Sequence, residues 1–225
     1  MQNKRNMKNG FTLAEVLITL VIIGVIAAMT IPTLMNNTNK QELVSKLKKT
    51  YSTMAQATNR IITDEGNPRG DMGGWATSPE AVYNMYKKYL NKAKDCGSGS
   101  GCFESMVSNN GYYKKLNGGN YYNSRFASNQ FYRLILSDGA QLLIADTASD
   151  CSQSYHDSTN GCSSLWIDIN GEKKPNQWGR DIFIFILKED GLYPAGCEGN
   201  SSDCNKNSTG YNCACKVFRE NAMNY

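Results

Sequence analysis

The chain has 225 residues, of which 40% are hydrophobic and 20% charged, and its formal net charge is +4. This length and composition allow one modest globular core. Three of the positive charges lie at the start, at Lys4, Arg5 and Lys8, so the rest of the chain is nearly neutral. A nearly neutral domain gives no electrostatic reason to expect binding to DNA or to acidic membranes.

The first predicted element is a membrane-spanning helix over residues 11–31. This run contains one ionisable side chain, Glu15. At roughly 1.5 Å per residue its helix is about 30 Å long and can cross a bilayer core. The basic residues before it predict a cytoplasmic N-terminus and an outer C-terminus. A removed secretory signal peptide is the alternative, but the run is long and no small-x-small site follows closely.

The residues around the start of this helix form a continuous pattern. Gly10 is followed by the aromatic Phe11, by Glu15 at the fifth position after the glycine, and by Pro32 after the apolar run. This pattern resembles the class III leader of type IV pilins and type II secretion pseudopilins. The resemblance implies that a prepilin peptidase removes residues 1–10 by cutting after Gly10 and then methylates the new amino group on Phe11.

The chemistry of these residues agrees with that resemblance. Gly10 lets a protease approach the backbone closely because it has no side chain. A carboxylate such as Glu15 inside the membrane costs about 2.5–3.5 kcal/mol and by default has a partner or a function. The resemblance implies that Glu15 of one subunit meets the Phe11 amine of the next. The alternative is a carboxylate near the membrane surface with no role in assembly.

Residues 32–62 are predicted to continue the helix in amphipathic form. Apolar side chains recur at intervals of four, four and three residues, at Leu43, Leu47, Tyr51 and Met54. The lysines lie opposite this stripe and are expected to be its solvated face. Pro32 is expected to kink the helix without stopping it, and residues 66–68, with the sequence Gly-Asn-Pro, to end it.

Residues 63–225 are expected to form one extracytoplasmic globular domain. The sequence predicts a short helix at 79–90 and strands at 131–136, 140–145, 166–169 and 182–187. The first two strands are separated by Ser137, Asp138 and Gly139, which favours a hairpin. The expected fold class is therefore α+β: a long N-terminal helix packed on a small antiparallel sheet with disulfide-rich loops, as in pilins.

The later strands resemble, more loosely, the sheet region of pseudopilin and minor-pilin domains. That resemblance leaves calcium binding open in a loop near the last strands. Asp168, Asn170 and Gly171 form a short acidic loop. An EF-hand, however, places its glycine at position six and needs a later glutamate, which is missing here. We predict a plain turn and name no cofactor and no metal ligand.

The cysteines predict disulfides in an oxidising compartment. There are eight, all C-terminal to the apolar run: Cys96, Cys102, Cys151, Cys162, Cys197, Cys204, Cys213 and Cys215. Proximity favours the pairs Cys96–Cys102 and Cys151–Cys162, and the last four are expected to pair among themselves. A zinc site made by those four is the alternative, although they lack the paired Cys-x-x-Cys spacing.

The sequence does not predict an enzyme. Its only histidine, His156, lies between Ser154 and Asp157, and residues this close in sequence cannot form a catalytic triad. No phosphate-binding glycine loop, dinucleotide fingerprint or paired-carboxylate motif is present. Four tyrosines could stack on a ligand, although packing or simple exposure is the favoured interpretation: Tyr112, Tyr113, Tyr121 and Tyr122.

We therefore expect a structural subunit of a type IV pilus or a type II secretion pseudopilus. Its expected partners are prepilin peptidase, other pilin subunits in a helical filament, and membrane lipid before assembly; nucleic acid is not expected. It would begin as a single-pass inner-membrane protein and end in an envelope or extracellular filament. The alternatives are an adhesin-like minor pilin that binds a ligand, and a signal-anchored envelope protein unrelated to filaments.

Overall fold

The structure is a computed structural model that describes residues 11–104, 112–122, 128–198 and 204–225. The chain divides into two compact units, Met1–Asn39 and Lys40–Tyr225. Each unit is described by itself. The helix α1 (Leu13–Glu65) begins in the first unit and contributes its later residues to the second.

The first unit contains the apolar part of α1. Its segment Leu13–Pro32 is 20 residues long with a mean hydropathy of 2.5, and none of it is buried. By length and composition it can cross a membrane. Pro32 lies in the interior of α1, so the prediction that this proline does not stop the helix is confirmed.

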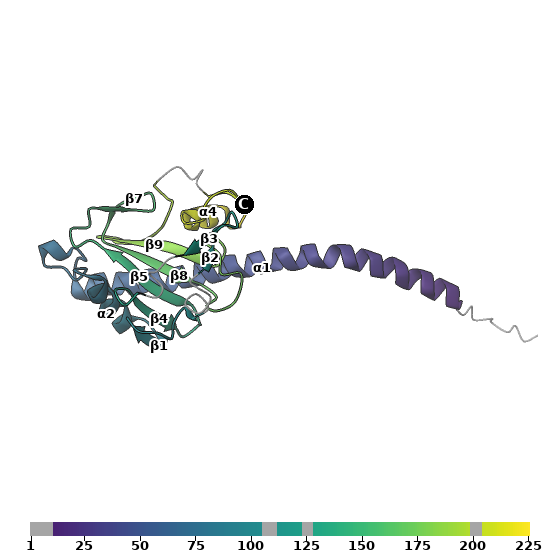
Figure 1. Cartoon of the computed structure of the whole chain (residues 1–225), viewed down its shortest axis with the longest axis horizontal. Coiled ribbons are helices and arrows are strands. Elements are labelled where there is room, and N and C mark those ends of the chain that lie inside the picture. The colour runs from purple at the N-terminus through teal and green to yellow at the C-terminus, as the bar shows by residue number, and fades with distance from the viewer. Residues whose placement is uncertain (1–10, 105–111, 123–127, 199–203) are drawn as a thin grey trace, which may run out of the picture. The chain divides into compact units, whose positions relative to one another are not determined.

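The second unit is built on one six-stranded antiparallel sheet (Figure 1). Its strand order is β1-β4-β5-β8-β9-β10. The strands are β1 (Lys92–Gly97), β4 (Tyr132–Leu136), β5 (Gln141–Thr147), β8 (Ser163–Asp168), β9 (Ile182–Lys188) and β10 (Gly191–Pro194). All four predicted strands are present, and β4 and β5 form the predicted hairpin.

The sheet is apolar on both faces because both faces are covered. In β9, residues 182–187 are all apolar and all buried, which is the pattern of a strand between two layers. Phe183 and Phe185 pack into the cluster that contains α1, whereas Ile182, Ile184 and Ile186 pack into a second cluster. A one-residue shift in the pairing of β9 would move each of these side chains to the opposite face of the sheet. The pairing register of β9 is therefore important for packing, even though its sequence does not alternate between apolar and polar residues.

Helices cover one face of the sheet. The amphipathic part of α1 buries Val44, Leu47, Met54, Ala57 and Ile61 in the cluster that includes the inner residues of β5, β8 and β9. Each such side chain, when fully buried, contributes about 1.5–3 kcal/mol relative to exposure. The predicted amphipathic stripe is therefore the core-facing side of α1, and the helix ends at Glu65, before Gly66, whose φ is 87°.

The second helix, α2 (Pro79–Tyr89), packs on the same face, as predicted from its sequence. Ser78 caps it by accepting a hydrogen bond from the backbone N–H of Ala81 at 3.2 Å. The hydroxyl of Tyr86 on α2 is 2.6 Å from that of Thr58 on α1, and both side chains are buried. This bond fixes the two helices to each other inside the apolar layer.

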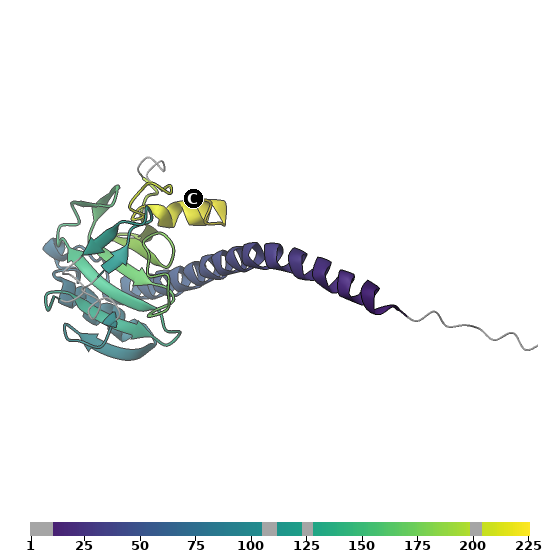
Figure 2. The same cartoon turned by 45° about the vertical axis from the view of Figure 1, so that its right-hand side comes forward.

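Several elements were not predicted from the sequence, because most are short and polar. They are β1, β10, β2 (Tyr112–Lys114), β3 (Asn120–Tyr122), β6 (Gln153–Tyr155), β7 (Ser158–Gly161), the 3-10 turn η1 (Gly70–Met72) and the helix α4 (Cys213–Glu220). The edge strand β1 is exposed along most of its length, so it shows no apolar alternation. Helix α4 lies over the sheet near β9 (Figures 1 and 2).

Disulfides join all eight cysteines. The pairs are Cys96–Cys102, Cys151–Cys162, Cys197–Cys215 and Cys204–Cys213. The first two are the pairs that proximity favours, and the last four cysteines pair among themselves as expected. Because no cysteine remains a thiol, the zinc alternative is wrong. Two of the bridges tie α4 to the loops that precede it.

The Cys204–Cys213 bridge is expected to stabilise the C-terminal region. The double substitution Cys204→Ala/Cys213→Ala removes a bridge of sequence separation 9. We expect the free energy of unfolding to fall by about 2–3 kcal/mol, because the unfolded chain gains freedom. Urea titration of the full chain in detergent measures this. The matched surface variant Ser45→Ala should stay within about 0.5 kcal/mol of the wild type. An unchanged midpoint in the double variant would contradict the expectation.

Candidate processing and assembly site

The predicted cleavage residue Gly10 lies outside the described residues, as do Lys4, Arg5 and Lys8. The described geometry of the site therefore starts at Phe11. Phe11 is 87% exposed to solvent. Two residues further on, α1 begins at Leu13.

Thr12 and Glu15 form a reciprocal cap at the start of α1. The carboxylate oxygen Oε2 of Glu15 accepts from the backbone N–H and from the hydroxyl of Thr12, each at 2.8 Å. In return, the backbone N–H of Glu15 donates to Oγ1 of Thr12 at 3.3 Å. This is the capping box, in which Ser or Thr and a Glu three residues later satisfy the free N–H groups of a helix start.

The cap gives Glu15 a role within its own chain. A carboxylate at a helix N-terminus is favoured by the helix dipole as well as by its hydrogen bonds. The Thr-x-x-Glu spacing of Thr12 and Glu15 is a sequence signal for this cap, which differs from both the predicted amine partner and the alternative of a carboxylate without a role. Both hydrogen bonds that Thr12 donates go to Oε2, and among the described residues no hydrogen bond reaches Oε1.

The apolar residues of α1 that follow are exposed. Large side chains from Val16 to Ile31 are between 45% and 74% exposed. A continuous apolar surface of this extent is not stable in water and must be covered by lipid or by other protein. The site therefore combines a capped helix start with a surface that requires a second molecule or a bilayer.

The second unit contains two buried carboxylates at the ends of strands. Asp168 ends β8 and Asp181 precedes β9, and both are almost fully buried. Asp181 accepts from the backbone N–H groups of Asn176 and Gln177, each at 2.7 Å. Asp168 accepts from the hydroxyl of Tyr113 at 3.2 Å and from the backbone N–H of Asn170 at 3.1 Å.

Burial raises the pKa of both carboxyl groups. Burial raises the pKa of Asp168 well above its ordinary value, and repulsion by Asp181 raises it further. Burial raises the pKa of Asp181 to about 6, although the backbone donors of Gln177 and Asn176 oppose the shift. Both shifts have the same main cause, because ionising a carboxyl group this deep in the protein costs solvation.

These carboxylates hold loops together. Asn170 donates to the preceding Asp168, so the residues after β8 form a turn, as predicted. Among the described residues no group of three or more His, Cys, Asp or Glu side chains is arranged to hold a metal ion. Calcium binding stays the alternative to the plain turn, and Asp168 and Asp181 here accept hydrogen bonds from the protein.

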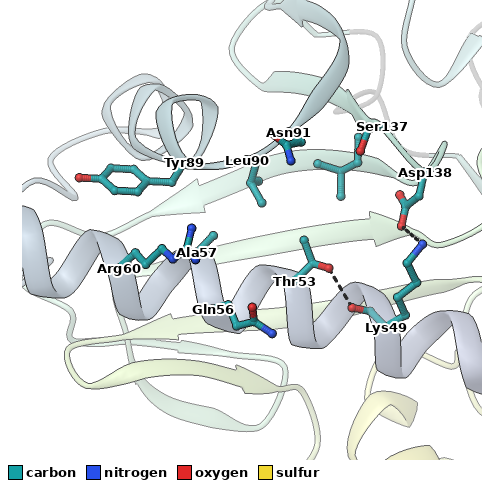
Figure 3. Close-up of a pocket in the computed structure, with 11 residues that line it drawn as sticks. Lys49, Thr53, Gln56, Ala57, Arg60, Tyr89, Leu90, Asn91, Ser137 and Asp138 are labelled. Atoms are coloured by element: carbon teal, nitrogen blue, oxygen red, sulfur yellow. Dashed lines mark hydrogen bonds and ion pairs between the residues drawn. The ribbon is translucent and has the colours of Figure 1, made fainter.

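A hollow of about 290 Å³ lies beside α1 (Figure 3). Its lining comes from α1, from the end of α2 and from the β4–β5 turn: Lys49, Thr53, Gln56, Ala57, Arg60, Tyr89, Leu90, Asn91, Leu136, Ser137 and Asp138. Lys49 and Asp138 form an ion pair across it at 3.1 Å. Among the described residues of this lining, the one carboxylate, Asp138, is therefore held by Lys49.

Two of the residues considered for a catalytic or ligand-binding role, His156 and Tyr113, pack against other side chains of the domain. His156 sits in the turn between β6 and β7, and its ring lies edge-on to Tyr211 at 5.7 Å and to Trp166 at 6.4 Å. Tyr113 is 1% exposed and donates to Asp168, so it is a core residue. The side chains of Tyr112, Tyr121 and Tyr122 lie outside the described part of the structure.

The carboxylate pair makes stability depend on pH. Because the folded pKa values are raised, the pair's stabilising contribution is present below about pH 4 and is lost as pH rises through about 6. Asp168→Asn should reduce the decline in unfolding free energy between pH 5 and pH 7 by roughly 1–3 kcal/mol relative to the wild type. Urea titrations at both pH values measure this. Equal declines in the two proteins would refute the raised pKa of Asp168.

Two protein families match the chain, one over its N-terminal segment and the other over most of the remaining residues. Residues 5–31 match the prokaryotic N-terminal methylation motif, and residues 33–215 match a family of unknown function, DUF6613. No curated protein and no solved structure matches the chain. The methylation motif covers the predicted cleavage residue, the capped helix start and nearly all of the exposed apolar segment. The chain belongs to the DUF6613 family, and its N-terminal methylation motif makes it a subunit of the type IV pilin and pseudopilin kind.

Proposed function

We propose that this protein is a structural subunit, a minor pilin or a pseudopilin, of a type IV pilus or a type II secretion pseudopilus. The observation that carries the proposal is the methylation motif at residues 5–31, placed on an exposed apolar helix. Prepilin peptidase removes residues 1–10 and methylates the amino group of Phe11. The subunit then leaves the membrane and joins a filament through α1.

The exposed segment of α1 supports this sequence of events. Before assembly, its apolar side chains lie in lipid. After assembly, the same side chains pack against the corresponding helices of other subunits, because a filament interior can replace hydrocarbon as the environment of an apolar surface. The disulfides fit this topology, since the domain that contains them is then in an oxidising compartment.

Glu15 has a free oxygen for a second partner. In the described chain its Oε2 binds both donors of Thr12. A carboxylate accepts about four hydrogen bonds, so Oε1 can accept from the Phe11 amine of a neighbouring subunit while the cap stays intact. In this arrangement Thr12 orients the carboxylate, and the charge pairing between subunits sets their axial register.

A ligand-binding minor pilin would share this anchor and this processing. The tyrosine whose side chain is described, Tyr113, lies in the core, which removes one of the four aromatic residues considered for stacking. A signal-anchored envelope protein would differ in its mature N-terminus, so that terminus is the most direct measurement.

Processing predicts one chemical form of the mature chain. Mass spectrometry of the protein from membranes should find N-methyl-Phe11 at the N-terminus and no peptide from residues 1–10. In a strain that lacks prepilin peptidase, the same protein should keep its leader. Gly10→Val should also keep it, because a β-branched side chain blocks close approach of the protease. A wild-type protein that begins at Met1 would exclude the pilin class.

Assembly should depend on the charge of Glu15 and less on its cap. Glu15→Ala should lower the amount of subunit in sheared filaments by about tenfold or more, because it leaves an amine unpaired in an apolar interior. Thr12→Ala is the matched control, since it removes the cap and keeps the carboxylate. Membrane insertion of both variants should equal that of the wild type. Normal filament content with Glu15→Ala would show that the carboxylate has no role between subunits.

A further inference from the structure

The nearly neutral total charge of the globular unit hides an uneven distribution. The fold brings a loop that carries two lysines beside the first turns of α1 in this unit, which carry three more. We call these five side chains the basic surface: Lys40, Lys46, Lys48, Lys173 and Lys174. The total charge gave no reason to expect binding to an acidic membrane, but a local cluster of like charges is a different case.

Two observations place the loop after β8 beside this part of α1. The hydrogen bond and charge of Lys46 lower the pKa of Glu42, and the charge of Lys173 lowers it further, so Lys173 lies near Glu42. A Cβ on Gly171 would lie 2.7 Å from the carbonyl oxygen of Gly139, so the same loop also meets the β4–β5 turn. That turn is tied to α1 by the ion pair of Lys49 with Asp138.

Most of the positive charge of the basic surface is not neutralised by the chain. Lys46 pairs with Glu42 at 2.8 Å. Within the described ranges, no ion pair involves the other four lysines. Lys48 donates to the neutral amide of Asn221 at 2.6 Å, which leaves its charge in place.

The loop that carries Lys173 and Lys174 is held in place by hydrogen bonds. The side-chain amide of Asn170 donates to the carbonyl oxygen of Lys174 at 3.3 Å. Directly after this loop, Asp181 accepts from the backbone N–H groups of Asn176 and Gln177. The side chains of both lysines are nevertheless exposed, so a fixed backbone presents two charges to the surroundings.

The sequence sets the basic surface close to the end of the apolar segment. Exposed apolar side chains continue beyond Pro32 to Leu34 and Met35, and four polar residues then lead to Lys40. Five residues span at most about 18 Å when fully extended, and a helix is shorter. A bilayer that covers Met35 has a polar headgroup layer of about 5–7 Å outside its hydrocarbon core. Lys40 therefore cannot lie far from that layer.

We infer that the basic surface binds the phosphate groups of anionic phospholipids in the membrane that holds the apolar segment. The inference rests on the proposed function in one respect, the anchoring of that segment in a bilayer. The ammonium groups supply the charge complementary to phosphate, and the anchor keeps them within reach of it. A lysine near an anionic lipid surface is attracted strongly enough to change its occupancy about fivefold.

The experiment uses the full chain in two kinds of vesicle and an amine-acylating reagent that does not cross membranes. One vesicle is phosphatidylcholine alone, and the other contains about 30% phosphatidylglycerol, enough to give a negative surface potential. Mass spectrometry measures the labelling rate of each lysine. Labelling of Lys40, Lys173 and Lys174 should be about fivefold slower in the anionic vesicles. About 0.5 M salt should remove this difference, because it shortens the range of the attraction.

Lys88 is the control lysine inside the same molecule. It pairs with Glu65 at the end of α1, 25 residues after Lys40, and should be labelled at the same rate in both vesicles. Lys173→Glu/Lys174→Glu should abolish the slower labelling of Lys40 in the anionic vesicles. Lys94→Glu/Lys206→Glu makes the same change of charge at two exposed lysines outside the basic surface, and should preserve it. Thermal unfolding of both variants should match the wild type.

The outcomes separate lipid from other occupants of this surface. Equal labelling in the two vesicles would overturn the inference. Protection of the same size in both would overturn it as well, because a protein contact does not require anionic lipid. Protection by inorganic phosphate in the neutral vesicles would show a site for free phosphate instead of lipid.

The test also separates this inference from the proposed function. Processing at Gly10 and the effect of Glu15→Ala on filaments are measured without anionic vesicles, so both can hold when the lysines show no protection. Extraction of the protein from the vesicles by alkaline carbonate would instead show that the apolar segment is not inserted. That result would overturn the anchor and the lipid contact together.

Discussion

The packing of α1 on the sheet is the interaction on which the second unit depends. Its buried stripe from Val44 to Ile61 supplies one wall of the core, and the inner residues of β5, β8 and β9 supply the other. Without this helix, one face of the sheet would expose its phenylalanines and leucines to water. The same helix begins with an apolar segment that no part of the described chain covers. One element therefore serves both as a core wall and as an anchor.

The second face of the sheet is covered by aromatic side chains and by polar loops. Trp166 and Trp178 pack edge to face at 5.2 Å, and Tyr113 lies against Trp178. Asp168 and Asp181 bind the loops that cover this face. Buried carboxylates are costly, but here their hydrogen bonds fix loops that contain little regular structure. Disulfides secure the remaining C-terminal loops.

Particular elements show why some of the fold could be predicted from sequence. The α1 stripe, the strand β9 and the β4–β5 turn carry strong local signals: helical periodicity, a continuous apolar run, and Asp-Gly between two apolar segments. Strand β1 and helix α4 carry none, because β1 is a polar edge strand and α4 is held by disulfides that connect distant residues. The cap on Glu15 had a sequence signal, Thr-x-x-Glu, that the prediction did not use.

The sequence by itself determined the methylation motif and the apolar segment after it, and it predicted the processing point and the disulfides. Those features depend on a contiguous motif, a hydropathy run and a cysteine count, which are all local or compositional. Only the tertiary structure decided how the last four cysteines pair and that Asp168 and Asp181 are buried close enough to repel each other. Each of these depends on the path of the intervening loop, which no local pattern in the sequence specifies.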